Sequence, residues 1–378
     1  LFLLSAMAIV ESIDHYKGFS IVTAFITRRT EHSKGLLMPM ICIITFFLSA
    51  MVDNLTSTII VVKILRSVLP DQTELRHACG GLAVLAANAG GAWSPVGDVT
   101  TTMLWVQGKL TTASTVAWLL LPSLVSGVVP MAGIWWQAQD SASRVIEVGA
   151  VVQRDSPSPG NDKDEGNEVT GMSTFCLCTG FLSILSVPIL KVINGLPPYL
   201  GMMMALGTFW LIVNARIKSL GRLPHDSLHD SGILEALHKV DLASLLFFTG
   251  VLLAVGCLDS SGVLEAYAET LVELTGNNTM FLCSLLGISS AVVDNVPLVQ
   301  ASINMFDEEV DSPLWQLVAF TAGVGGSLLP MGSVAGVTLM GLDKVTFIWY
   351  CKNISFWAVL GFALGLATYQ LERSIFGS

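Results

Sequence analysis

Charged residues are scarce in this chain. Only 13% of its 378 positions are Asp, Glu, Lys or Arg, whereas 52% are hydrophobic, and the mean hydropathy is +0.67. A water-soluble domain needs a polar surface, so this composition excludes an ordinary globular protein. The few charges cluster between long apolar stretches, which is typical of a protein that crosses a membrane several times.

Other signals are missing as well. No basic run with interleaved aromatic residues occurs, so we expect no nucleic-acid partner. The seven cysteines have neither zinc spacing nor a disulfide framework, and we interpret them as buried free thiols. The six histidines lie in loops or interfacial segments without a ligand-like partner, and we interpret them as surface residues. The sequence indicates no cofactor, and we expect none.

Long apolar segments are abundant. A helix that spans about 30 Å of hydrocarbon needs roughly 20 apolar residues. Segments that meet this requirement are 78–105, 113–138, 172–193, 197–214, 242–258, 314–340 and 345–370. Residues 1–13 have the character of the end of another membrane helix. We therefore predict an all-α polytopic membrane protein surrounded by membrane lipids.

Two further apolar stretches, 36–69 and 277–306, are divided by the pairs Asp53-Asn54 and Asp294-Asn295. Each half of the first stretch reaches only about 25 Å at 1.5 Å per residue, which is short of a full crossing. We predict re-entrant helical hairpins whose tips lie near mid-membrane. Irregular backbone is tolerated at that depth only where protein buries it or where it lines a wet cavity.

The two hairpins belong to an internal repeat. Ser49-Ala-Met-Val-Asp-Asn-Leu matches Ser290-Ala-Val-Val-Asp-Asn-Val, and Gly90-Gly-Ala-Trp-Ser-Pro-Val-Gly-Asp-Val matches Gly325-Gly-Ser-Leu-Leu-Pro-Met-Gly-Ser-Val. Because an odd number of crossings separates the hairpins, we predict inverted repeats, each with a broken transmembrane helix. The predicted divisions are a first repeat 1–138 (hairpin 36–69, broken helix 78–105), a soluble linker 139–171, and a second repeat 172–372 (linker 215–240, hairpin 277–306, broken helix 314–340).

Three carboxylates stand in otherwise apolar surroundings, Asp53, Asp98 and Asp294. A charge at mid-bilayer costs a few kcal/mol or more, so such residues indicate an ion or proton pathway. Hard cations prefer oxygen ligands, which carboxylates, amides, hydroxyls and the carbonyls freed by a helix break all supply. Burial disfavours the ionised form of a carboxyl group, which therefore holds a proton until a cation displaces it. Competition of this kind is sufficient for antiport.

The predicted site is concentrated in the first repeat, because Ser333 replaces Asp98 and Gly323 replaces Asn88 in the second. The predicted ion-binding and proton-carrying residues are Asp53, Asn54, Asn88, Asp98, Thr100 and Thr101, with Asp53 and Asp98 as the Na⁺ ligands. Ser290, Asp294 and Asn295 are the predicted contributors from the second repeat, and Ser49, Thr56, Ser327 and Ser333 are further candidates.

Purely structural roles are the alternative for each of these residues. Asp53 and Asp294 could cap the half-helices that follow them, since Asp is a favoured N-cap residue. Asp98 could likewise serve structure alone, although a neutral cap would cost less in lipid. Thr100 and Thr101 could form hydrogen bonds to their own helix, and the same doubt applies to Asn88.

At these motifs the chain resembles the NhaD-type sodium/proton antiporters of the ion transporter superfamily. The resemblance rests on Ser49-Ala-Met-Val-Asp-Asn-Leu-Thr-Ser-Thr, on Asn88-Ala-Gly-Gly-Ala-Trp-Ser-Pro-Val-Gly-Asp-Val-Thr-Thr and on Ser290-Ala-Val-Val-Asp-Asn-Val-Pro. It implies exchange of Na⁺ for H⁺ at the residues named above, with Li⁺ as a further candidate ion. It also implies a homodimer with a scaffold domain and a transport domain, located in a plastid (chloroplast) envelope or a bacterial inner membrane.

Two other functions compete with this hypothesis. A sodium-coupled carboxylate or oxyanion transporter of the same superfamily would have a similar fold, but Asp53, Asp98 and Asp294 repel an anion unless cations screen them. An intramembrane aspartyl protease also uses two membrane carboxylates. Its Gly-x-Gly-Asp motif is not present, because Pro95 occupies the place of the first glycine. We therefore expect a transporter and not an enzyme.

Overall fold

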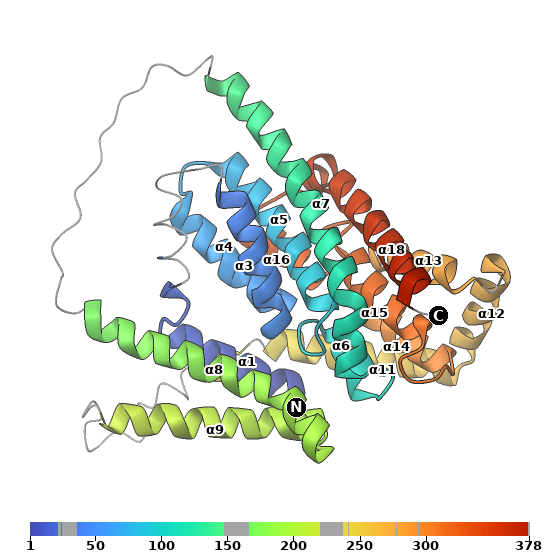
Figure 1. Ribbon diagram of the computed structural model, residues 1–378, viewed down its shortest axis with the longest axis horizontal. Helices are drawn as coiled ribbons and strands as arrows, with labels where there is room; N and C mark the ends of the chain where they lie inside the picture. Colours follow the sequence, from blue (N-terminus) through green and yellow to red (C-terminus); the bar gives the residue numbers. More distant parts are fainter. Residues whose placement is uncertain are drawn as a thin grey trace. The chain divides into compact units, whose positions relative to one another are not determined.

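The computed structural model describes residues 1–21, 24, 36–146, 166–219, 237–240, 242–276, 278–293 and 295–376. Within these ranges every regular element is a helix and no strand occurs (Figure 1). The predicted all-α fold class is confirmed.

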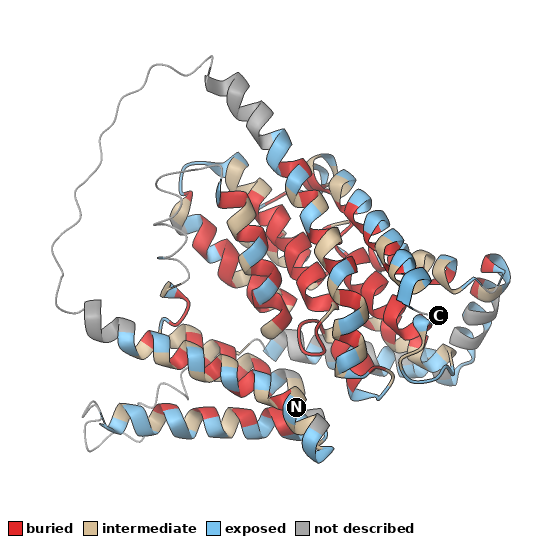
Figure 2. Cartoon of the chain, viewed as in Figure 1, coloured by how far each residue is buried: buried red, intermediate tan, exposed pale blue. Residues whose placement is uncertain are grey.

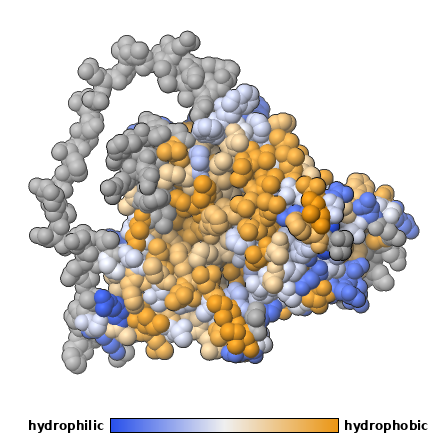
Figure 3. Space-filling model, viewed as in Figure 1, coloured by the Kyte–Doolittle hydropathy of each residue, from blue (hydrophilic) through white to orange (hydrophobic). Residues whose placement is uncertain are grey.

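Among the described residues, four helical stretches are long and apolar enough to cross a membrane. They are Thr112–Gln137 within α7 (Thr112–Ile146), Gly171–Lys191 within α8 (Gly166–Asn194), Tyr199–Ser219 within α9 (Pro198–Ser219), and Phe347–Phe376, which joins α17 (Phe347–Tyr350), a π-helical turn (Cys351–Ser355) and α18 (Phe356–Phe376). Large apolar side chains such as Leu182 and Leu211 are 71% and 72% exposed. Figure 3 shows apolar residues over much of the visible surface. Such a surface fits lipid and not water, and the chain is an integral membrane protein.

The chain forms two compact units, and each is built from two separate parts of the sequence. The first unit comprises Leu1–Leu37 and Trp135–Val240. In it, α1 (Phe2–His15) packs against both α8 and α9. The Ser173 hydroxyl donates to the Tyr16 carbonyl over 2.9 Å, and the Trp210 indole donates to Ser12 Oγ over 3.4 Å.

The second unit comprises Met38–Ile134 and Asp241–Ser378, and it contains both predicted hairpins and both predicted broken helices. Its helices from the first half of the chain are α3 (Leu37–Met51), α4 (Asn54–Val68), α5 (Thr73–Ala92), α6 (Val99–Val106) and most of α7. Those from the second half are α11 (Leu242–Ser260), α12 (Val263–Thr275), α13 (Thr279–Ser290), α14 (Asn295–Met305), α15 (Pro313–Gly325), α16 (Val334–Asp343), α17 and α18. The boundaries of the two units therefore differ from those predicted for the repeats. The division of the chain into two repeats stays a prediction.

Each predicted helix break is present, but the first broken helix is interrupted later than its glycines suggest. The α5 helix continues through Gly90 and Gly91 to Ala92, and the interruption lies at 93–98, around Pro95. Gly90 is needed for contact instead, because a Cβ there would collide with the Phe46 backbone. A glycine pair therefore marks close helix packing here and not the end of the helix.

The same contacts recur in the second half of the unit. A Cβ at Gly325 would collide with the Gly287 backbone, as one at Gly90 would with Phe46. The Ser49 hydroxyl donates to the Ala87 carbonyl over 2.6 Å, and the Ser290 hydroxyl donates to the Ala322 carbonyl over 2.9 Å. The first helix of each predicted hairpin, α3 or α13, therefore packs on the first half of its broken helix in the same way. Inversion of the repeats across a membrane stays a prediction.

The broken helices form the buried centre of this unit. Figure 2 shows buried residues concentrated along them, and α5 is buried without interruption from Cys79 to Ala92. The α15 helix packs against α5 and α6, while α16 packs against α4 and α5. The interpretation of all seven thiols as buried is confirmed for Cys42, Cys79, Cys176 and Cys283. It is wrong for Cys178 and Cys257, which are exposed, and for Cys351, which is half-buried.

Candidate functional site

Asp98 lies at the end of the first helix break, immediately before α6, and is only 1% exposed. Its Oδ1 accepts a hydrogen bond from Asn54 Nδ2 over 3.2 Å, and its Oδ2 accepts one from Thr100 Oγ1 over 2.9 Å. Although Asp98 occupies the N-cap position of α6, its side chain forms no capping hydrogen bond. The carboxylate is therefore held by side chains at the centre of the unit and does not serve to cap the helix.

Two asparagines extend this arrangement. The Asn54 side-chain amide, at the start of α4, also donates to Asn88 Oδ1 over 2.9 Å. Asn88, on α5, donates to Ser333 Oγ over 3.1 Å and to the Val84 carbonyl over 3.1 Å. Ser333 caps α16, since its Oγ accepts from the Gly336 amide over 3.3 Å. A continuous polar chain thus joins α16, α5, α4 and α6.

The second broken helix approaches Asp98 closely through Gly323 of α15. A Cβ at Gly323 would lie 3.0 Å from Asp98 Oδ2 and 3.8 Å from Thr100 Oγ1. In the repeat, Gly323 corresponds to Asn88, and Ser333 corresponds to Asp98. The contact of Gly323 with Asp98 is therefore the counterpart of the contact of Asn88 with Ser333. Such reciprocity is expected for two segments related by a two-fold axis.

Asp53 has a different environment. It is half-buried and caps α4, accepting from the Thr56 amide over 2.7 Å and from Thr56 Oγ1 over 2.8 Å. The capping role that the sequence left open is therefore present for Asp53. Its neighbour Asn54, and not Asp53 itself, makes the hydrogen bond to Asp98.

The remaining candidates differ in what they contact. Thr101 Oγ1 donates to the Ala92 carbonyl over 3.2 Å, so it supports the backbone of the break. Ser327 Oγ donates to the Val324 carbonyl over 2.6 Å, within its own segment. Asn295 is buried at the start of α14. Asp294 lies outside the described residues.

Sequence reasoning missed three residues. Gly323 has no side chain and matters only because α15 approaches Asp98. Ser57 is fully buried, and its hydroxyl has no hydrogen-bond partner among the described residues. It lies one turn beyond Asn54 on the same side of α4, a spacing that could have revealed it. The interpretation of His77 as a surface residue without a partner is wrong, because its Nε2 lies 3.0 Å from the Asp343 carbonyl oxygen.

The site offers a carboxylate, two carboxamides and hydroxyls in a buried setting. Hard oxygen ligands of this kind suit Na⁺ better than they suit a transition metal. Within the described ranges, no three His, Cys, Asp or Glu side chains converge as a transition-metal site would require.

Comparison with known proteins gives one consistent result. The profile of the citrate transporter family (CitMHS) matches residues 1–325. Sodium/proton antiporter 1 of Arabidopsis thaliana is 41% identical over 99% of this chain, which spans 62% of that relative's length. Sodium/proton antiporter 2 of the same plant is also 41% identical, with 97% of this chain and 83% of the relative covered.

Bacterial relatives are more distant. The Na(+)/H(+) antiporter NhaD of Alkalimonas amylolytica is 31% identical over 93% of this chain and 72% of its own length. These relatives are named as transporters and not as enzymes. The family profile and the similarity over nearly all of this chain thus show that the chain belongs to the citrate transporter (CitMHS) family and to the NhaD-type sodium/proton antiporters.

Proposed function

We propose that this protein exchanges Na⁺ for H⁺ across a membrane. The observation that carries the proposal is the buried Asp98 carboxylate, held by Asn54 and Thr100 where the two broken helices meet. An ionised carboxylate at this place needs a compensating cation, and a protonated one does not. Na⁺ and H⁺ therefore compete for Asp98, and the release of one permits the binding of the other.

The surrounding residues divide into two roles in this proposal. Asn54, Asn88 and Thr100 supply oxygen ligands beside the carboxylate, which replace part of the hydration shell of Na⁺. Ser333 orients the Asn88 amide, while Thr101, Ser49 and Ser290 support the backbone around the breaks. Asp53 is proposed as a second ionisable group at the start of α4. Asp294 and Asn295 are proposed as the contribution of the second hairpin.

Finer features of the proposal rest on the family resemblance. Li⁺ is a hard monovalent cation like Na⁺, and we propose that it follows the same route. We also propose a homodimer in which the unit that carries both hairpins moves relative to a scaffold. The plant relatives are more similar to the chain than the bacterial one is, which favours a plastid envelope over a bacterial inner membrane.

A second candidate function is sodium-coupled citrate or other carboxylate transport. The description of the matching family as citrate transporters favours it. The ionised Asp98 opposes it, because a carboxylate repels an anionic substrate at close range. Sodium-dependent citrate uptake without sodium-driven proton flux would establish this alternative.

The test uses everted membrane vesicles loaded with a pH-sensitive dye, to which Na⁺, Li⁺, K⁺ or citrate is added. The proposal predicts proton movement with Na⁺ and Li⁺ and none with citrate. Asp98→Asn should abolish the response, because an amide can neither carry the proton nor neutralise the cation. The control is Asp307→Asn. Asp307 is also an aspartate, but its side chain is fully exposed, and its ion pair with Lys109 is long, at 3.9 Å. Wild-type exchange in Asp98→Asn would refute the assignment.

A further inference from the structure

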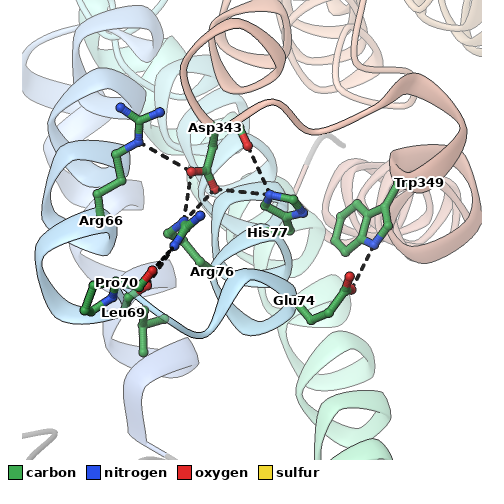
Figure 4. Close-up of polar contacts among 8 residues, drawn as sticks. All are labelled: Arg66, Leu69, Pro70, Glu74, Arg76, His77, Asp343 and Trp349. Atoms are coloured by element: carbon green, nitrogen blue, oxygen red, sulfur yellow. Dashed lines mark hydrogen bonds and ion pairs between the residues drawn. The ribbon is translucent and has the colours of Figure 1, made fainter.

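A cluster of ionisable residues, drawn in Figure 4, joins three helices. The Asp343 carboxylate accepts from Arg76 Nε over 2.9 Å and 3.1 Å, and Arg66 Nε lies 3.4 Å from its Oδ1. His77 Nε2 lies 3.6 Å from its Oδ2. The cluster combines residues from the end of α4, the start of α5 and the end of α16.

The position of Asp343 requires an explanation. Its side chain is 3% exposed, and a buried carboxylate is strongly unfavourable unless it is paired. It also stands at the C-terminal end of α16, where the helix dipole disfavours negative charge. Both costs are offset by the arginines, so the cluster holds the end of α16 against α4 and α5.

Arg76 connects all three helices by itself. While its Nε binds Asp343, its Nη1 donates to the Leu69 and Pro70 carbonyls over 2.9 Å each. These carbonyls follow the last turn of α4, where backbone acceptors have no partner within the helix. The planar guanidinium can donate to the Asp343 carboxylate and to the two carbonyls at once, which a lysine could not do.

The same three helices meet again at the candidate site. The α4 helix begins at Asn54 and α16 begins after Ser333, and both end at the cluster, whereas α5 runs in the opposite direction and carries Asn88. These helices pack against one another along their length. They are thus fixed at one end by the hydrogen bonds of Asn88 and at the other by Asp343.

A related contact lies just before α15, where Asp311 meets the segment between α6 and α7. The Asp311 carboxylate accepts from the Thr111 amide over 2.7 Å and from Thr111 Oγ1 over 2.8 Å. Asp311 precedes Gly325 by as many residues as Arg76 precedes Gly90. Asp311 and Arg76 are therefore counterparts in the repeat. The beginning of the second broken helix is therefore tied to the start of α7 by hydrogen bonds, whereas the beginning of the first is tied to the end of α16 by ion pairs to a buried carboxylate.

We propose that Asp343 is a positioning residue for cation binding. By fixing the end of α16, it sets where Ser333 meets Asn88, and through Asn88 and Asn54 it sets the ligand geometry around Asp98. No residue of the cluster is among the proposed ligands of the ion. The proposal rests on the proposed function, because its main readout is the apparent KM for Na⁺.

The test compares Asp343→Asn, Arg76→Gln and Arg66→Gln in the full chain, with Asp307→Asn as the control. Asp343→Asn and Arg76→Gln should raise the KM for Na⁺ about threefold or more. Arg66→Gln should have a smaller effect, because its side chain is 49% exposed and that of Arg76 is 14% exposed. The amount of protein in the membrane and its thermal unfolding midpoint are measured in parallel.

A double variant separates positioning from a general loss of stability. If Asp343 acts through Ser333, Asp343→Asn and Ser333→Ala combined should raise KM no further than the larger single effect. Additive effects on KM would overturn the proposal, and so would a KM within twofold of wild type in both Asp343→Asn and Arg76→Gln. If Asp343→Asn does not accumulate, Arg76→Gln decides by the same criteria, alone and combined with Ser333→Ala. A wild-type protein without sodium-driven proton release would refute the proposed function instead.

Discussion

Asn88 donates a hydrogen bond to Ser333 over 3.1 Å, although the two residues lie 245 positions apart in the sequence. The contact joins the first broken helix to the second at the level of the polar site. On the other side of the site, Gly323 leaves the space that the Asp98 carboxylate occupies. Neither broken helix could form this arrangement without the other, so the site belongs to the pair.

Asp53 allows charge and helix capping to be tested separately. Asn caps a helix about as well as Asp, so Asp53→Asn should keep the free energy of unfolding close to that of wild type. Asp53→Ala should lower it by about 1 kcal/mol through loss of the bonds to Thr56. If the Asp53 charge takes part in exchange, Asp53→Asn should abolish sodium-driven proton release. Full exchange in a stable Asp53→Asn protein would leave capping as the only role of Asp53.

Gly323 should tolerate no side chain. In Gly323→Ala the new Cβ would lie 3.0 Å from Asp98 Oδ2, so either the carboxylate or α15 must shift. We expect a rise in the KM for Na⁺ of about tenfold, because sub-ångström misplacement of a ligand costs on the order of 1 kcal/mol or more. Gly207→Ala is the matched control, since no atom lies within 4 Å of a Cβ there. Equal KM values in the two variants would contradict the close approach of α15.

Ser333→Ala removes two hydrogen bonds at once, the one from Asn88 and the cap of α16 at Gly336. We expect the free energy of unfolding to fall by about 1–2 kcal/mol, as for the loss of an N-cap with a buried partner. The KM for Na⁺ should also rise, because Asn88 loses the group that orients it. Ser260→Ala serves as the control, since the Ser260 hydroxyl is exposed and donates only to Cys257 in its own helix. Denaturant unfolding and vesicle transport measure the two effects independently.

Part of the structure could be predicted from residue chemistry alone. Apolar runs of membrane length were enough to predict the helices, and the two Asp-Asn pairs were enough to predict the breaks between α3 and α4 and between α13 and α14. Polar residues within apolar stretches were enough to nominate Asn54, Asn88, Asp98 and Thr100, because such residues are costly in lipid. The glycines at 90 and 91 do not mark the position of the first break, since buried glycines can serve helix contact while the helix continues.

Contacts between segments that are distant in the sequence could not be predicted. Gly323 has no chemistry of its own, and its importance comes from the Asp98 side chain that it accommodates. Asp343 and His77 are ordinary in sequence, near the polar ends of apolar segments, where charged residues are expected in solvent. Only the meeting of α4, α5 and α16 turns Asp343 into a buried partner of Arg76. An acidic residue in the last turn of an apolar helix was the available signal, because the helix dipole opposes it.

The central claim is that one carboxylate, Asp98, binds Na⁺ and H⁺ in alternation. Equilibrium binding of radioactive sodium to the purified protein, measured across a range of pH, tests it most directly. The account predicts saturable binding by wild type whose apparent affinity falls as pH is lowered, up to about tenfold per pH unit for one competing proton. It predicts no binding by Asp98→Asn at any pH. Sodium affinity that is independent of pH, or that survives in Asp98→Asn, would contradict it.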